Sequence, residues 1–74
     1  MQIQVRLYAT FRIGRFNEQT RDYPPGTRIS KVLEDLEIDE SLIGTAFIDF
    51  KYATLDRELH EGARLGIFPK VGGG

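Results

Sequence analysis

The chain has 74 residues, of which 10 are Lys or Arg and 11 are Asp or Glu, and its formal net charge is −1 at pH 7. A chain of this length forms one small domain, and its balanced charge favours neither nucleic acid nor an anionic membrane as a partner. It has no cysteine, which excludes a disulfide framework, a thiol nucleophile and a thiolate metal site, and its single histidine, His60, is too little for zinc. We therefore expect that the chain binds no metal and no cofactor.

The distribution of apolar residues points to a soluble protein. No stretch approaches the about 18 apolar residues that a membrane-spanning helix needs. The opening sequence MQIQVRLYAT lacks the charged start and the apolar block of a signal peptide. We expect a cytoplasmic protein without a membrane partner.

The first third of the chain predicts two strands. Ile3, Val5 and Leu7 alternate with polar residues, and this period of two is typical of a strand with one buried face. After a loop at residues 9–16, the polar segment 17–23 predicts a strand at the edge of the sheet. The two strands are close enough in sequence to form a hairpin.

Two prolines and a glycine at residues 24–26 predict a turn that leads into a helix. Proline fixes φ and removes a hydrogen-bond donor, and glycine permits the turn. Thr27 is a suitable N-cap for the helix that follows. The apolar residues behind it recur at helical spacing: Ile29, Val32, Leu33 and Leu36. This stripe predicts one helix that packs on the core.

The run TAFIDF, residues 45–50, predicts a third strand. We expect this strand to continue through residues 51–53 and to turn there. In the connection that follows, Leu55 and Leu59 are placed to close the open side of the core.

The last predicted strand is among the most apolar. Leu65 and Ile67 are expected to face inward and Phe68 outward, and Pro69 should end the pairing because proline has no N–H group. An apolar strand of this kind needs a central position with a partner on each side.

The order of elements is therefore strand, strand, helix, strand, strand. Placing the first and last strands side by side and parallel, with the helix across one face, buries all the inward aliphatic residues in one core. This is an α+β, β-grasp (ubiquitin-like) fold with a mixed sheet. We expect the domain to occupy residues 1–71 and a flexible glycine tail to occupy residues 72–74.

With these elements in this order, the chain resembles the ubiquitin-like sulfur carriers of molybdopterin and thiamine biosynthesis. The resemblance runs through VRLYATFR, PPGTRISKVLEDL, AFIDF and LHEGARLGIFPKVGGG. Phe68, Pro69 and Val71 before the glycines resemble the molybdopterin branch in particular. Two features depart from the family: residues 49–51 stand where an Asn-Gly-type turn is usual, and three glycines follow Val71 rather than a larger residue and then two.

The resemblance implies that the chain is a protein substrate and not an enzyme. An ATP-consuming adenylating enzyme would join the carboxylate of Gly74 to AMP, and a sulfur donor would then convert the adenylate to a thiocarboxylate. Gly72 and Gly73 would thread into a narrow channel of that enzyme, because glycine has no side chain to obstruct entry. As the small subunit of molybdopterin synthase, the chain would donate its sulfur beside the large subunit, where catalysis would take place.

The resemblance also places a docking surface on the outward face of the sheet. It would comprise Tyr8, Tyr52 and Phe68, with Pro69 and Val71 leading toward the tail. Exposed aromatic residues near a strand edge suit a protein interface. The alternative for each aromatic residue is simple burial.

Other functions remain open at this point. The tail would equally serve a sulfur carrier for thiamine or cysteine biosynthesis, or a ubiquitin-like modifier that is joined to lysine through Gly74. A plain β-grasp interaction module is a fourth reading, in which the glycines have no role. An acid and base pair drawn from Asp56, Glu58 and His60 is disfavoured, because three polar residues on a turn are ordinary turn chemistry.

Overall fold

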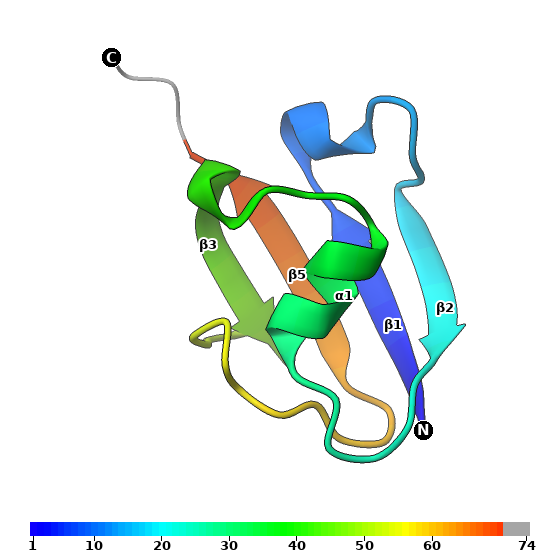
Figure 1. Ribbon diagram of the computed structural model, residues 1–74. Helices are drawn as coiled ribbons and strands as arrows, with labels where there is room; N and C mark the ends of the chain where they lie inside the picture. Colours follow the sequence, from blue (N-terminus) through cyan, green and yellow to red (C-terminus); the bar gives the residue numbers. More distant parts are fainter. Residues whose placement is uncertain (71–74) are drawn as a thin grey trace.

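The computed structural model describes residues 1–70 and shows a five-stranded mixed sheet with one α-helix across one face (Figure 1). The strands lie in the order β2-β1-β5-β3-β4. Their bounds are β1 Gln2–Leu7, β2 Glu18–Asp22, β3 Ile43–Ile48, β4 Lys51–Tyr52 and β5 Arg64–Pro69, and α1 is Ile29–Asp35. The short 3-10 helices η1 and η2 are Ala9–Arg12 and Glu40–Leu42. The expected β-grasp arrangement is confirmed, while the expected boundary at residue 71 and the glycines at 72–74 lie outside the described residues.

The first and last strands form the centre of the sheet, as expected. β1 and β5 are parallel, with Val5 opposite Leu65 and Leu7 opposite Ile67. All four side chains are at most 1% exposed. Each contributes about 1.5–3 kcal/mol through its removal from water. The core also takes in the helical stripe and the connection after β4: Ile29, Val32, Leu33 and Leu59 are buried.

The start of α1 differs from the prediction, because Thr27 is not its N-cap. The Thr27 hydroxyl donates to the Pro24 carbonyl at 2.7 Å, and Arg28 is the cap residue, with no side-chain hydrogen bond. The N–H groups of Ile29 and Ser30 donate instead to carbonyls of the connection after β4, at 3.1 and 2.8 Å. Since backbone carbonyls satisfy these groups, a side-chain cap is not needed.

The end of α1 is held by an arginine from the loop between β1 and β2. Arg15 donates from Nε to the Leu36 carbonyl at 3.1 Å and from Nη2 to the Glu37 carbonyl at 3.3 Å. Leu36 is the C-cap residue of α1 and Glu37 follows it, at the end of the helix where carbonyl groups lack intrahelical partners. A guanidinium is well suited to this position, because it also favours the negative end of the helix dipole.

The prediction that the third strand continues through residues 51–53 is wrong. β3 ends at Ile48, and a two-residue turn at Asp49 and Phe50, with φ of 51° and 68°, returns the chain as β4. Two positive φ values are the type I′ pattern that matches the twist of a hairpin. Asparagine and glycine are the usual residues here, so Asp49 fits better than Phe50, which adopts the left-handed region at a cost of about 1–2 kcal/mol. The sheet therefore has five strands and not four.

The end of β5 lies against a bulge in β3. β5 ends at Pro69 as predicted, and one further hydrogen bond follows, from the Lys70 N–H to the Leu42 carbonyl at 2.9 Å. The register shifts between Ile43 and Thr45, which leaves Gly44 as the extra residue. A Cβ at Gly44 would lie 2.7 Å from the Pro69 oxygen, so glycine is required for this close approach.

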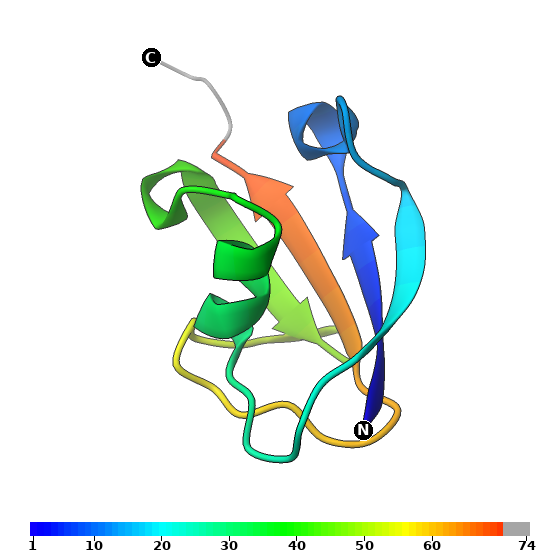
Figure 2. The same ribbon diagram turned by 45° about the vertical axis from the view of Figure 1, so that its right-hand side comes forward.

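The helix leaves one face of the sheet open. In the second view α1 covers one side of the central strands, and no other described segment crosses the opposite side (Figure 2). Within residues 1–70, no helix is both long enough and apolar enough to cross a membrane.

Candidate protein-binding face

Four aromatic rings form a continuous row across the open face of the sheet. They come from the four neighbouring strands β1, β5, β3 and β4 or the residue directly after a strand. Tyr8, directly after β1, stacks on Phe68 of β5 with ring centroids 3.9 Å apart and planes 9° apart. Phe68 meets Phe47 of β3 edge to face at 5.6 Å, and Phe47 meets Tyr52 of β4 at 4.8 Å. We call Tyr8, Phe68, Phe47 and Tyr52 the aromatic row.

The backbone register explains why these rings meet. Strand side chains alternate between faces, so residues beside Leu65 and Ile67 in sequence point away from the core. Phe47 is opposite Tyr52 in the β3–β4 pair and opposite Gly66 in the β3–β5 pair. At Gly66 a Cβ would lie 3.4 Å from a ring atom of Tyr8, so the absence of a side chain lets Tyr8 lie over β5.

Exposure differs along the aromatic row. Tyr52 is 79% exposed, whereas Tyr8, Phe47 and Phe68 are each partly covered by their aromatic neighbours. Phe68 faces outward as expected and is neither fully exposed nor buried. Three of the rings, Tyr8, Phe47 and Phe68, border a hollow of about 300 Å³, which Phe50 and Gly66 also line.

Two aromatic residues of this face were not predicted as part of it. The sequence pattern predicts Phe47 within a strand but not the face on which it lies, and it predicts Phe50, which is 79% exposed, as part of the same strand. The correct turn would have identified both. Once Asp49 and Phe50 are the two turn residues, Phe47 must lie opposite Tyr52 and Phe50 must lie at the tip.

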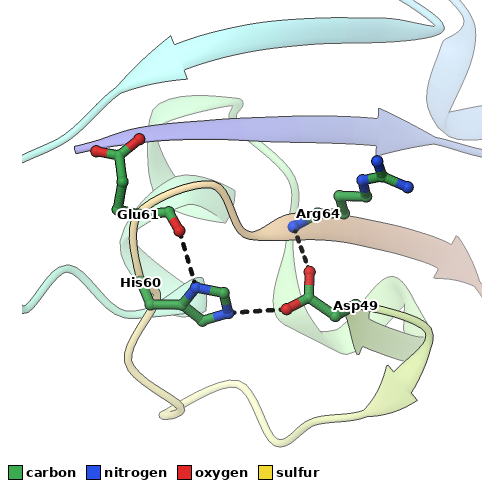
Figure 3. Close-up of polar contacts among 4 residues, drawn as sticks. All are labelled: Asp49, His60, Glu61 and Arg64. Atoms are coloured by element: carbon green, nitrogen blue, oxygen red, sulfur yellow. Dashed lines mark hydrogen bonds and ion pairs between the residues drawn. The ribbon is translucent and has the colours of Figure 1, made fainter.

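A polar cluster fixes the turn that carries Phe50 (Figure 3). The Asp49 carboxylate accepts from the Arg64 backbone N–H at 3.0 Å and lies 2.9 Å from Nε2 of His60, while Nδ1 of His60 lies 3.0 Å from the Glu61 carbonyl. Donation from the Arg64 N–H, with His60 as a second partner, lowers the pKa of Asp49 below its ordinary value. The cluster joins the β3–β4 turn to the beginning of β5.

The structure does not assemble the alternative acid and base site. His60 is bound to Asp49 and not to Asp56 or Glu58. Asp56 accepts from the Thr54 hydroxyl at 2.6 Å, which lowers the pKa of Asp56, and Glu58 lies 3.8 Å from Arg28. Within residues 1–70, no three His, Asp or Glu side chains are grouped to hold a metal ion.

The end of β5 adjoins the aromatic row. Pro69 follows Phe68 directly, and a second hollow, about 530 Å³, is lined by Phe47, Phe68, Pro69 and Lys70 together with Gly44 and Thr45. The remaining predicted site residues, Val71 and the glycines Gly72, Gly73 and Gly74, lie outside the described residues. The described chain thus ends beside the predicted docking surface.

The sequence pattern of the ThiS family matches residues 5–74, nearly the whole chain. The chain belongs to the ThiS family. It is thus a member of the ubiquitin-like sulfur carriers, as the resemblance in sequence indicated. No curated protein sequence matches the chain.

Solved structures share the fold of this ThiS-family chain at low sequence identity. A Pyrococcus furiosus protein described as molybdopterin converting factor subunit 1 aligns with a TM-score of 0.77 and 24% identity, covering 96% of this chain and 99% of that one. SAMP1 from Haloferax volcanii aligns at 0.75 and 18%, covering all of both chains. The complex of subunits 1 and 2 of the Helicobacter pylori molybdopterin-converting factor aligns at 0.68 and 15%, again over all of both chains. At these identities the likeness extends to the fold alone.

Proposed function

We propose that this protein carries sulfur as a thiocarboxylate on Gly74 and donates it in molybdopterin biosynthesis, as the small subunit of molybdopterin synthase. The observation that carries the proposal is a family match that runs through the β-grasp domain and on to the glycines. The Phe68-Pro69 pair and Val71 favour the molybdopterin branch. The Helicobacter pylori neighbour belongs to a complex of two subunits, which supports a large-subunit partner here.

The chemistry requires activation of Gly74 before sulfur transfer. A carboxylate oxygen of Gly74 attacks the α-phosphate of ATP on an adenylating enzyme, and pyrophosphate leaves. Sulfur that a donor supplies as sulfide, HS⁻, then attacks the acyl carbon, the bond from that carbon to the bridging oxygen breaks, AMP leaves with this oxygen, and the sulfur loses its proton to give the thiocarboxylate. Glycine suits this position because no side chain shields the carbonyl carbon.

The domain supplies binding energy that the glycines themselves cannot. Ordering a backbone residue costs about 1–2 kcal/mol, so threading several glycines into a partner needs compensating contacts elsewhere. The aromatic row offers them, since large aromatic side chains commonly anchor protein interfaces. Its position beside Pro69 and Lys70 places those contacts close to the chain that leads to Gly74.

The test is a three-step reconstitution with an adenylating enzyme and a molybdopterin synthase large subunit from the same organism. We expect ATP–pyrophosphate exchange, then a gain in intact mass equal to the replacement of one oxygen by sulfur, then conversion of the cyclic pterin precursor to the dithiolene. The unmodified carboxylate form should give no dithiolene. Each carrier holds one sulfur, so two carriers should be consumed per product and return to their unmodified mass.

Removal of Gly73 and Gly74 provides the matched control. The core that the structure describes is complete without Gly73 and Gly74, so we expect an unchanged melting temperature together with loss of pyrophosphate exchange. Normal exchange by the truncated chain would reject the carrier function.

A protein modifier is the second candidate, favoured by the likeness to SAMP1, whose second structure is titled small archaeal modifier protein 1. In that case Gly74 would be found in isopeptide bonds to lysine. A third outcome, sulfur acceptance by thiazole synthase but not by the pterin enzyme, would retain the carrier chemistry and reject the molybdopterin branch.

A further inference from the structure

Three arginine side chains lie over aromatic rings of the open face. The Cζ atoms of Arg6 and Arg12 are 5.4 and 5.6 Å from the centroid of the Tyr8 ring. The Cζ atom of Arg64 is 5.9 Å from the centroid of the Phe50 ring. A guanidinium at this distance is attracted by the electron-rich face of the ring. The aromatic residues therefore hold cations at both the β1 side and the turn side of the face.

These cations are incompletely neutralised. Arg6 lies 3.9 Å from Glu18, and both side chains are about half exposed, which makes the pair weak. Within residues 1–70, no carboxylate lies at ion-pair distance from Arg12 or Arg64. The Arg64 side chain extends away from Asp49, whose carboxylate is already bound by the Arg64 N–H and His60 (Figure 3).

An acidic run lies in and after α1, which covers the other face of the sheet. Five carboxylates occur within seven positions in and after α1: Glu34, Asp35, Glu37, Asp39 and Glu40. Lys31 pairs with two of them, Asp35 at 3.3 Å and Glu34 at 3.8 Å. The three arginines of the open face and this acidic run therefore lie on different parts of the surface, although the formal net charge is only −1. Such a charge distribution orients an approaching charged partner.

We propose that the open face binds a protein surface whose apolar centre is bordered by Asp and Glu side chains, which meet Arg6, Arg12 and Arg64. This inference rests on the proposed function, because it names the chemistry of the partner that docks on the aromatic row. The apolar centre meets the aromatic row, and the carboxylates lie around it. The same arrangement disfavours docking through the acidic helical face.

The arginine side chains make contacts within the protein that order them before any partner binds. Arg12 is held by donation from Nε to the Leu7 carbonyl at 2.9 Å, and the rings restrict Arg6 and Arg64. A side chain that is already ordered loses less entropy on binding. Charges at the border of an interface act mainly on the association rate and on its salt dependence.

The experiment measures binding of the full chain to the adenylating enzyme and to the large subunit over a series of KCl concentrations. The variants are Arg64→Gln, Arg12→Gln and their combination, and Arg12→Lys retains the charge at one site. Arg57→Gln is the matched control, because Arg57 is exposed on the connection after β4 and its side chain makes no ion pair within residues 1–70. Thermal unfolding of each variant verifies that it is folded.

For the wild type we expect affinity and association rate to fall as salt rises. Each single Gln variant should weaken binding about two- to fivefold at low salt, the combination about tenfold, and the slope against salt should flatten. Arg57→Gln should bind like wild type, Arg12→Lys should retain most of the affinity, and all variants should converge at high salt because screening removes the border charges.

Two results would overturn the inference. The first is wild-type binding that does not depend on salt, and the second is an equal effect of Arg57→Gln and Arg64→Gln. In either case pyrophosphate exchange and the mass gain would still establish the carrier function separately. Absence of exchange together with salt-dependent binding would instead reject the carrier function and retain the acidic partner. Absence of any binding by the wild type would reject the proposed partner surface.

Discussion

The two faces of the sheet are built from the same strands but satisfy different requirements. On β5, Leu65 and Ile67 are at most 1% exposed beneath α1, while their neighbour Phe68 lies on the other side and contacts the rings of Tyr8 and Phe47. On the face that α1 covers, aliphatic side chains from the sheet and the helix exclude water. On the open face, aromatic rings contact one another and stay partly exposed, so apolar area remains accessible there. The comparison shows that alternate residues of one strand can build a buried aliphatic core and a partly exposed aromatic face.

The largest effect on folding should come from the helical face. Ile67→Ala removes a fully buried side chain and leaves a cavity, so the free energy of unfolding should fall by about 2–5 kcal/mol. Denaturant titration measures it. A loss below 1 kcal/mol would show that the two faces are not divided as described.

Phe68→Ala tests the same strand one residue further along. We expect it to weaken the complex with the large subunit by about 2 kcal/mol or more, as loss of an interface aromatic residue commonly does. The free energy of unfolding should fall by less than the roughly 3–5 kcal/mol of a fully buried phenylalanine, because Phe68 is only partly covered. Calorimetry on both equilibria separates the effects, and a large stability loss with unchanged binding would assign Phe68 to folding alone.

The smallest effect concerns pH and the turn that carries Phe50. The pKa of Asp49 is lowered chiefly by the Arg64 N–H, so its carboxylate stabilises the folded state above the unfolded pKa of about 3.9. This contribution is lost as pH falls through the still lower pKa of the folded state. Asp49→Asn should therefore be less stable than wild type at pH 7 and pH 5, and the difference should shrink toward pH 3.

Asp22→Asn is the matched control for this titration, because the Asp22 side chain makes no hydrogen bond or ion pair within residues 1–70. It should differ little from wild type at each pH. A constant deficit for Asp49→Asn from pH 7 to pH 3 would contradict a role for the ionised carboxylate.

Local pattern was sufficient for much of the fold. The alternation of Ile3, Val5 and Leu7 and the helical spacing of Ile29, Val32 and Leu33 each predict the buried face correctly, because burial and periodicity are coupled within a single element. Local pattern does not predict the turn at Asp49 and Phe50, because this turn depends on pairing between two segments. Phenylalanine is a strand former, and only the pairing of Phe47 with Tyr52 forces it into a left-handed conformation.

The sequence by itself determined the class of the fold, the outward direction of Tyr8 and Phe68, and the family to which the chain belongs. Only the tertiary structure decided that Phe47 bridges Phe68 and Tyr52, and that backbone carbonyls of the connection after β4 take the place of a Thr27 cap. It also decided that three arginines lie over the rings of the open face. These features depend on contacts between segments that are distant in sequence, and no local period encodes which distant residue completes a contact.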